Sequence, residues 1–394
     1  MRRASVLWEA LVTRFEAALE GHRLGRLSSD EAGEALGMSG RQFRRLRVRY
    51  GAEGEAGLRD RRPGRVSGRR APEAELERMH RLYREEYADF TVKHFHEELR
   101  RRHGYRLGYT VTRLSLQSAG LVAKAKRRGA HRKKRVRRPL PGMLLFQDGS
   151  THRWIGALER DLDLVVTLDD ATGEIASALP VEQEGTMSSF LGLAETIAAK
   201  GLFGSLYTDR VSHYFLTPQA GGKVDKRAPT QVGRALAQLG IRHIPSYSPE
   251  ARGRMERAFG TLQGRLPPEF RLAGVTTLAA GNAYLREVFV PACNARFGKP
   301  AAEEGTAFVA YAGLSLAEVL CVQADRQVGR DNCVAWQGRS LQIPPQRHRQ
   351  HYVRAMVRVH EYPDGRLALF DGPRCLARYQ SDGALIEHPI RRAA

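Results

Sequence analysis

The chain has few cysteines, no long apolar run and a shortage of acidic residues. Its 394 residues include four cysteines at intervals of 28, 12 and 42 residues, and none forms a CxxC pair. A zinc ribbon or a disulfide framework is therefore not expected. No apolar stretch approaches the roughly 20 residues that cross a bilayer, and Glu9, Arg14 and Glu16 interrupt the apolar residues near the start, unlike a signal peptide. We expect a cytoplasmic protein without membrane contact.

The shortage of acids leaves a strong positive charge. Lysine and arginine number 64 against 43 aspartates and glutamates, which gives a formal net charge of +21 at pH 7. Such a field favours polyanionic partners, and the planar fork of arginine suits phosphate groups. Composition alone leaves three interpretations open: a DNA-binding protein, an RNA-packing protein such as a ribosomal one, or a GC-rich genome that uses arginine for lysine.

Residues 1–65 contain the pattern of a helix-turn-helix. Ser28 or Ser29 can cap a first helix, Gly37 can end it, and Ser39 can cap a second helix with two apolar side chains facing inward. The basic residues on the rest of that second helix are Arg41, Arg44, Arg45, Arg47 and Arg49. The pattern predicts an all-α DNA-binding domain whose recognition helix contacts DNA through the first three of these arginines. The alternative is a helical hairpin with a solvated basic face.

A second all-α, helix-turn-helix-like module is expected at residues 66–122, where apolar residues recur at helical spacing. Two tandem modules would bind a longer DNA sequence than one. Within this segment His94 and His96 form an HxH pair, but no cysteine lies near them in the sequence. We expect both histidines at the surface and not on a metal ion.

A basic linker follows at residues 123–141. Between Lys124 and Arg138 the chain has ten lysines or arginines and no acid. This composition favours an arm on DNA phosphates or in a minor groove, and it is equally typical of a solvated linker. The predicted DNA contacts in the arm are Lys124, Lys126, Arg127 and Arg128.

Residues 142–300 alternate between apolar runs and helical periodicity. Strands are expected at 143–147, 162–168, 174–181, 202–207 and 241–245, and helices at 187–200, at 231–239 and from 248 through 266. Three meandering strands followed by helix, strand, helix, strand and helix match an α/β RNase H-like fold.

Three acids in this domain have positions that suit catalysis. Asp148 ends the first expected strand, Asp209 ends the fourth, and Glu256 lies beside the apolar stripe of the last helix. Carboxylate oxygens are ligands that Mg²⁺ prefers, and two such ions about 3.5–4 Å apart can activate an oxygen nucleophile and neutralise the leaving oxygen of a phosphodiester. The sequence therefore indicates a site that cleaves and rejoins DNA, in which Asp148 bridges two cations.

Each acid also has a structural interpretation. Asp148 and Asp209 could be turn formers, and Glu256 could form an ion pair with Arg252 one helical turn earlier. Because all three acids fall on elements that suit a catalytic site, we favour the catalytic interpretation.

Other residues in this domain keep two interpretations. Asp169 and Asp170 are rival metal ligands, but their place in a hairpin turn favours turn chemistry. Trp154 is either a core residue or a platform on which a base stacks. The arginines expected to contact phosphates beside the site are Arg252, Arg254 and Arg257.

The strings QDGSTHRW, YTDR and YSPEARGRMERAFGTL resemble the three acidic motifs of DDE transposases with an integrase catalytic core. Residues 20 to 390 are similar to insertion-sequence transposases of the ISNCY group, most strongly between 142 and 300. Around Glu256, the residues Pro249 and Gly253 correspond to the family's proline-x-x-x-glycine-x-x-glutamate pattern.

The resemblance implies that Asp148, Asp209 and Glu256 hold two Mg²⁺ or Mn²⁺ ions. It further implies binding to the terminal inverted repeats of an insertion sequence, strand cleavage and transfer to target DNA, and a homodimer or larger assembly on double-stranded DNA. Two features depart from compact retroviral-type integrases: the interval of 47 residues from Asp209 to Glu256, and the absence of the N-terminal zinc ligands.

Residues 325–394 show short strand-like runs around a turn at 363–365. They predict a small SH3-like β-barrel, which either contacts DNA or a partner subunit or acts as a structural cap.

Taken together, the sequence predicts a DDE-type DNA transposase. Two alternatives are a helix-turn-helix regulator with an inactive core and a nuclease that acts on RNA–DNA hybrids. The helix-turn-helix pattern disfavours the second, because an A-form duplex hides its major groove from a helix.

Overall fold

The computed structural model describes residues 2–60, 70–124, 135–219, 222–225, 227–247, 253–313, 315–346 and 349–386. The chain divides into a unit of Met1–Glu75 and a unit of Leu76–Ala394, and each is described by itself. Four predicted DNA contacts lie outside the described residues: Lys126, Arg127, Arg128 and Arg252. Within the described ranges, no helix combines the length and the apolar character of a membrane span.

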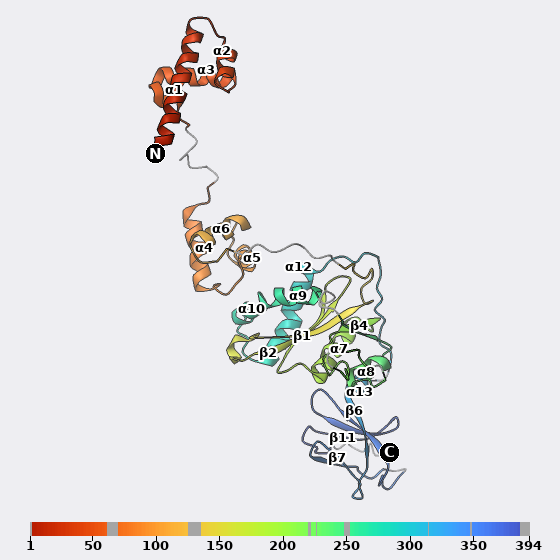
Figure 1. Cartoon of the computed structure of the whole chain (residues 1–394). Helices are drawn as coiled ribbons and strands as arrows, with labels where there is room; N and C mark the ends of the chain where they lie inside the picture. Colours follow the sequence, from red (N-terminus) through yellow and green to blue (C-terminus); the bar gives the residue numbers. More distant parts are fainter. Residues whose placement is uncertain are drawn as a thin grey trace. The chain divides into compact units, whose positions relative to one another are not determined.

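The first unit contains the two helices that the turn pattern predicted. Its helices are α1 (Arg2–Arg23), α2 (Ser29–Ala35) and α3 (Gly40–Glu53) (Figure 1). The Ser28 hydroxyl accepts a bond from the Glu31 amide at 3.2 Å, and the Glu31 carboxylate accepts one from the Ser28 amide at 2.7 Å, so α2 begins with a capping box. Ser39 caps α3 through the Gln42 amide. Phe43 is fully buried against α1.

A second group of helices follows, as expected. It comprises α4 (Glu73–Glu85), α5 (Val92–Arg102) and α6 (Tyr109–Ser118). Their common core includes Tyr87, Phe95 and Leu116, which are at most 1% exposed.

The central domain is built on one five-stranded sheet in the order β3-β2-β1-β4-β5. The strands are β1 (Leu145–His152), β2 (Leu162–Asp169), β3 (Ile175–Val181), β4 (Ser205–Thr208) and β5 (Arg242–Pro245). The first three form an antiparallel meander, whereas β4 runs parallel to β1 and β5 parallel to β4. Along the chain, the meander is followed by helix, strand, helix, strand and helix, which is the order of elements that the sequence predicts.

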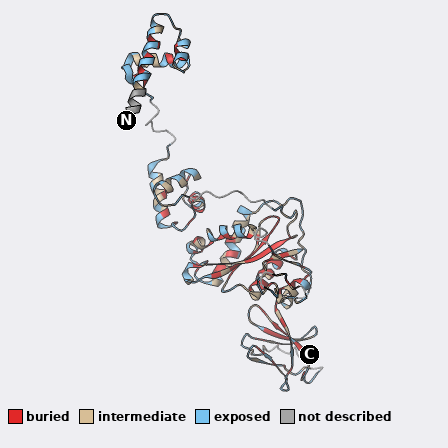
Figure 2. Cartoon of the chain, in the orientation of Figure 1, coloured by how far each residue is buried: buried red, intermediate tan, exposed pale blue. Residues whose placement is uncertain are grey.

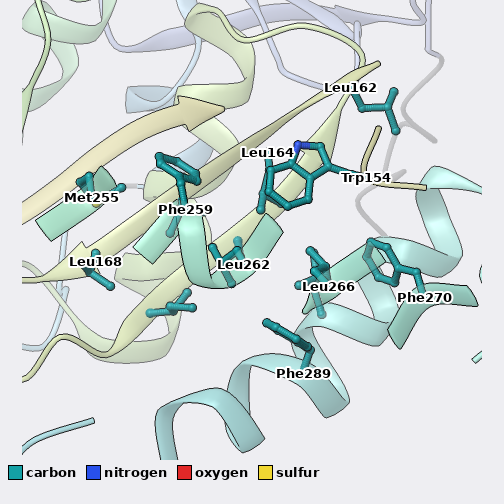
Figure 3. Packing of buried hydrophobic residues seen from close by; sticks show 14 of the residues in the cluster. Trp154, Leu162, Leu164, Leu168, Met255, Phe259, Leu262, Leu266, Phe270 and Phe289 are labelled. Atoms are coloured by element: carbon teal, nitrogen blue, oxygen red, sulfur yellow. The ribbon is translucent and has the colours of Figure 1, made fainter. Parts of the chain in front are cut away.

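Helices cover both faces of the sheet, and the strands are the most buried part of the central domain (Figure 2). One face packs on α7 (Thr186–Lys200) and α8 (Gln231–Gln238). The other packs on α9 (Gly253–Gln263), α10 (Leu266–Leu272), α11 (Leu278–Tyr284) and α12 (Val290–Phe297) (Figure 3). Side chains of β1 alternate between these cores: Leu145 joins the α7 side and Phe146 the α9 side.

Two predicted boundaries in this domain were wrong. Strand β1 does not end at Asp148, because its ladder with β2 continues to the pair of His152 and Leu162. The helix expected to run through Leu266 ends at Gln263, and α10 then starts with prolines in its first turn, where a helix tolerates them.

Three side chains whose environment the sequence left open or predicted wrongly are buried. Trp154 is fully buried, and its indole N–H donates to the Ser150 carbonyl at 2.8 Å, so it is a core residue. His94 and His96 were expected at the surface, which was wrong: they are 1% and 6% exposed. The cause is that α5 is covered on two sides, by Glu269 of α10, 3.0 Å from the His94 ring, and by Thr112 of α6, 3.0 Å from the His96 ring.

The C-terminal region forms two sheets, and the predicted barrel is not confirmed. Strands β6 (Val322–Gln327), β9 (Met356–Glu361), β10 (Leu367–Asp371) and β11 (Arg374–Tyr379) form an antiparallel sheet in the order β11-β10-β9-β6. Strands β7 (Cys333–Trp336) and β8 (Arg339–Gln342) form a separate hairpin. No closed barrel is present among the described strands.

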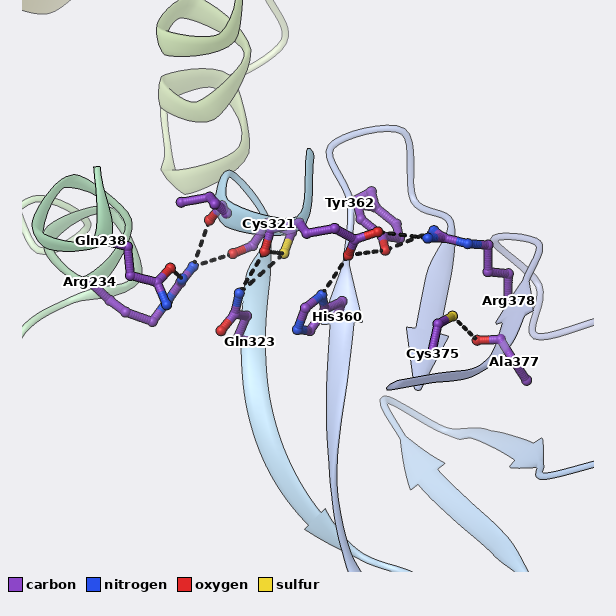
Figure 4. Close-up of polar contacts among 11 residues, drawn as sticks. Arg234, Gln238, Cys321, Gln323, His360, Tyr362, Cys375, Ala377 and Arg378 are labelled. Carbon is purple, nitrogen blue, oxygen red and sulfur yellow. Dashed lines mark hydrogen bonds and ion pairs between the residues drawn. The ribbon is translucent and has the colours of Figure 1, made fainter. Parts of the chain in front are cut away.

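Polar contacts join this region to the central domain (Figure 4). Glu318 of α13 (Leu316–Val319) accepts hydrogen bonds from Tyr362 and Arg378, both at 2.7 Å, and its carboxylate lies 2.9 Å from Nδ1 of His360. Arg234 of α8 donates to the carbonyl oxygens of residues 319 and 321. The C-terminal sheet is therefore anchored to the helices on the α7 side.

Candidate active site

The register of the central strands brings Asp148 and Asp209 to neighbouring positions. Phe146 pairs with Tyr207 across the parallel β1–β4 ladder, and each aspartate lies two residues further along its own segment. The rings of Phe146 and Tyr207 are 5.4 Å apart in the core that α9 covers. Because side chains alternate along a strand, Asp148 is directed to this same face. It is 8% exposed, whereas Asp209 is half-buried.

Glu256 lies in the first turn of α9, on the same face of the sheet. Its neighbour Met255 is buried in the core, while Glu256 itself is exposed. At the other end of α9, the Gln263 amide donates to the Ser150 hydroxyl at 3.2 Å. Helix α9 therefore runs alongside β1, the strand that carries Asp148.

The donor chemistry of these residues fits a hard cation, because all three offer carboxylate oxygens. Within the described ranges, however, no three His, Cys, Asp or Glu side chains are grouped so that they could hold a metal ion. The two aspartates are positioned by adjacent strands, and the long side chain of Glu256 is at the surface of α9.

A buried polar network connects the segment after Asp209 to β1. The Tyr214 side chain is 1% exposed, and its hydroxyl donates to the Gln147 side-chain oxygen at 3.1 Å. The same hydroxyl accepts from Ser189 of α7, also at 3.1 Å. The Gln147 amide donates in turn to the Thr167 hydroxyl of β2 at 3.2 Å. Every hydrogen bond of this network lies on the α7 side of the sheet, the face opposite to the one toward which Asp148 is directed.

A fourth carboxylate, Glu184, lies beside this network, and the sequence reasoning missed it. A Cβ atom at Gly149 would collide with the Glu184 carboxylate, so the missing side chain of Gly149 makes room for it. Burial, followed by the charges of Glu184, Asp148 and Asp209, raises the pKa of Tyr214 far above its usual value. The position of Glu184 in the sequence could have indicated it. This residue lies between β3 and α7, at the end of the sheet toward which β1 also runs.

Two histidines near Asp209 are half-buried, and burial lowers the pKa of both. Burial lowers the pKa of His213, although the Asp209 charge opposes this, and the His213 ring lies 3.7 Å from the Glu184 carboxylate. Burial and His213 together lower the pKa of His243 to about 4. The His243 ring is 3.0 Å from the Thr208 hydroxyl, so it packs directly behind β4.

The rival acids, Asp169 and Asp170, are engaged in structural contacts. Asp169 accepts bonds from the amides of Thr172 and Gly142, both at 2.8 Å. Asp170 is fully buried, accepts a bond from the backbone amide of residue 138, and forms ion pairs with Arg135 and Arg254. These contacts agree with the turn chemistry expected for the pair.

The remaining predicted DNA contacts occupy different environments. Four are exposed on the helical segments or just after them: Arg41, Arg44, Arg45 and Lys124. Arg257 is exposed on α9, one residue after Glu256. Arg254 is half-buried by its ion pair with Asp170. Their contact with DNA stays a prediction.

Comparison with known proteins identifies two curated relatives, while no family model matches the chain. The chain is 32% identical over 351 residues to the putative transposase y4bF of Sinorhizobium fredii, covering 87% of this chain and 75% of that protein. It is 27% identical over 309 residues to the transposase for insertion sequence IS1202 of Streptococcus pneumoniae, covering 70% of this chain and 66% of that protein.

Solved structures give weaker matches. The HTLV-2 integrase catalytic core domain in complex with magnesium has 15% identity and a TM-score of 0.28, over 38% of this chain and 89% of that one. The simian T-cell lymphotropic virus intasome, in complex with a PP2A regulatory subunit, has 16% identity and a TM-score of 0.31, over 66% and 84%.

Proposed function

Because the chain belongs to the transposases, we propose that it cleaves DNA strands and transfers them through Asp148, Asp209 and Glu256. The observation that supports this most is the β1–β4 register, in which Phe146 pairs with Tyr207, two residues before Asp148 and Asp209 respectively. Glu256, exposed near the start of α9, is the third acid of the proposed site.

The proposed cofactor is Mg²⁺ or Mn²⁺, with two ions per site. Asp148 would contact both ions, and Asp209 and Glu256 would each complete the ligands of one. When bound, the cations would lower the pKa of the attacking oxygen and neutralise the leaving 3′-oxygen. In support of this, the Tyr214 network joins Gln147, the neighbour of Asp148, to the segment that follows Asp209. Glu256 can reach toward the two aspartates through its long, exposed side chain.

The proposed substrate is double-stranded DNA: the terminal inverted repeats of an insertion sequence and a target site. The exposed arginines of α3 support sequence recognition by this helix, since Phe43 faces the core and leaves them on the outer surface. The net charge of +21 supports contact with many phosphates. Joining two ends at one target requires two sites, so we propose a homodimer or larger assembly that works at the nucleoid.

A strand-transfer assay tests this proposal. The element's own ends, found as short inverted repeats flanking the coding region, are incubated with the full chain and Mg²⁺. We expect wild-type protein to nick these ends and join them to target DNA, and Asp148→Asn to bind the ends without cutting them. Wild-type protein that binds the ends but never cuts them in Mg²⁺ or Mn²⁺ would instead indicate an inactive DNA-binding regulator.

A further inference from the structure

A cavity of about 390 Å³ lies beside α9, and its charged lining is entirely basic. The cations around it are Arg137, Arg254, Arg257 and Lys299. No aspartate or glutamate belongs to the described residues that line the cavity, and most of the other lining side chains are apolar. Such a cavity has the positive charge and the apolar lining that favour the binding of an anion.

The cations around the cavity are crowded against one another. Arg254 and Arg257 lie three residues apart on α9, and both line the cavity together with Arg137. Burial, followed by Arg257, lowers the pKa of Arg137. The charge of Asp169 opposes this shift, and the buried Asp170 already forms ion pairs with Arg135 and Arg254. An anion in the cavity would relieve this repulsion.

Several donors around the cavity are held in place. The Arg137 guanidinium donates to the carbonyl oxygens of Asp170 and Ala171, at 2.9 and 3.0 Å, which fixes it against the turn between β2 and β3. The Arg257 Nε donates to the carbonyl of residue 253, leaving its terminal nitrogens for another partner. The backbone amide of Lys299 donates to Thr172 at 3.0 Å, which ties the segment after α12 to the same turn.

We propose that this cavity binds a phosphate group of the DNA backbone next to the strand-cleaving site. Arg257 directly follows Glu256 on α9, so the two side chains leave the helix one residue apart along its axis and about 100° apart around it. A guanidinium matches a phosphate through two parallel hydrogen bonds, and Lys299 adds a compact positive charge. The inference rests on the proposed function, because it takes DNA as the source of the phosphate.

The salt dependence of DNA binding tests the charges. Full-length protein is titrated with element-end duplex at several salt concentrations, without divalent cations. We expect the double variant Arg257→Gln/Lys299→Gln to reduce the slope of log K against log salt by about 1, the value for one phosphate contact. The control variant Arg286→Gln/Arg366→Gln removes two exposed positive charges that lie away from the cavity. We expect this control to keep the wild-type slope. Equal slopes in both double variants would overturn the proposal.

A second variant tests the cavity itself without changing any charge. Thr261 lines the cavity, so Thr261→Phe fills part of it, whereas Ala237→Phe adds the same ring to the exposed side of α8. We expect only Thr261→Phe to reproduce the smaller slope, with a melting temperature close to that of the wild type. An unchanged slope in this variant would overturn the proposal.

Inorganic phosphate separates the two possible sources of the anion. If phosphate raises the melting temperature of the wild type but not of Arg257→Gln/Lys299→Gln, while DNA slopes are equal, the cavity takes free phosphate only and the inference is wrong. These binding readouts do not depend on catalysis. Failure of strand cleavage with an intact slope difference would therefore contradict the proposed function and leave the phosphate site standing.

Discussion

The hydroxyl of Tyr214 donates a hydrogen bond to the side-chain oxygen of Gln147, 3.1 Å away. Gln147 immediately precedes Asp148 on β1, and Tyr214 lies five residues after Asp209. The bond therefore joins the two segments that carry the proposed catalytic aspartates. It does so inside the core on the α7 side, where an unpaired polar group is costly.

Removing this hydroxyl should loosen the position of Asp209 relative to Asp148. In Tyr214→Phe, Gln147 and Ser189 each lose a buried partner, so we expect the free energy of unfolding to fall by about 1–3 kcal/mol. We also expect strand cleavage to require several-fold more Mg²⁺, because the two carboxylates are less well held. Urea unfolding and a Mg²⁺ titration of cleavage measure the two effects.

Tyr379→Phe is the matched control for this prediction. The Tyr379 side chain is fully buried in the C-terminal sheet, and its hydroxyl donates to the Gln342 carbonyl at 2.8 Å. This variant should lose similar stability and keep the wild-type Mg²⁺ requirement. If both variants shift the Mg²⁺ requirement equally, the effect comes from general destabilisation and the positioning role of Tyr214 is contradicted.

The contact between Gly149 and Glu184 predicts an effect on cation binding with little effect on folding. In Gly149→Ala, the new methyl group displaces the Glu184 carboxylate, which is the far end of a flexible side chain and can move at small cost. Because a negative charge moves away from the aspartates, we expect the Mg²⁺ requirement of cleavage to rise several-fold, as in Glu184→Gln.

Gly233→Ala on α8 is the control for the glycine substitution. A Cβ atom at Gly233 meets only ordinary contacts, so this variant should gain about 0.5–1 kcal/mol of stability and keep its Mg²⁺ requirement. A wild-type Mg²⁺ requirement in Gly149→Ala, together with a raised one in Glu184→Gln, would show that Gly149 does not position Glu184.

The ion pairs of Asp170 should contribute far more to stability than exposed ion pairs do. Asp170→Asn removes the charge that faces Arg135 and Arg254 at a fully buried position, so we expect a loss of about 3–5 kcal/mol in the free energy of unfolding. Asp364→Asn removes the exposed partner of Arg366 and should cost less than about 1 kcal/mol. Chemical denaturation compares the two variants, and similar losses would contradict the structural role of Asp170.

The half-buried His243 predicts that acid destabilises the fold. Its pKa is about 4 in the folded protein and near 6.5 when unfolding exposes the ring. Between these values only the unfolded state binds the proton, so stability falls as the pH is lowered from about 6.5 to about 4, by at most about 3 kcal/mol. Below that range this contribution is constant. Urea midpoints measured across the window should depend less on pH in His243→Gln, and an equally steep dependence would contradict the assignment.

The sequence predicted the central sheet well because its signals are local. Apolar runs separated by turn residues define the strands, and helical periodicity defines α7 and α8 to within a residue or two. The end of β1 was wrong because strand length depends on how far β2 continues to pair. The surface placement of His94 was wrong for a similar reason, since its partner Glu269 lies far away in the sequence.

The candidate site was predictable only in part. The motifs single out Asp148, Asp209 and Glu256, and the β1–β4 register pairs the residues that stand two positions before the first two. Neither Glu184 nor the Tyr214 network could be derived from spacing, because these contacts join segments from β1, α7 and the stretch after β4. The ion pair of Arg254 with Asp170 was missed as well, and it gives this arginine a structural contact that its position beside Glu256 did not suggest.

Metal-specific rescue tests most directly whether the three acids act on shared cations. Cysteine is placed in turn at Asp148, Asp209 and Glu256, with Glu287→Cys as a control on an acid outside the motifs. Thiolate suits softer divalent metals better than Mg²⁺. We predict that each of the three variants loses strand cleavage in Mg²⁺ and recovers part of it in Mn²⁺ or Cd²⁺, while the control stays active in Mg²⁺. Full Mg²⁺-dependent cleavage by Glu256→Cys, or no recovery at any of the three positions, would contradict a shared metal site.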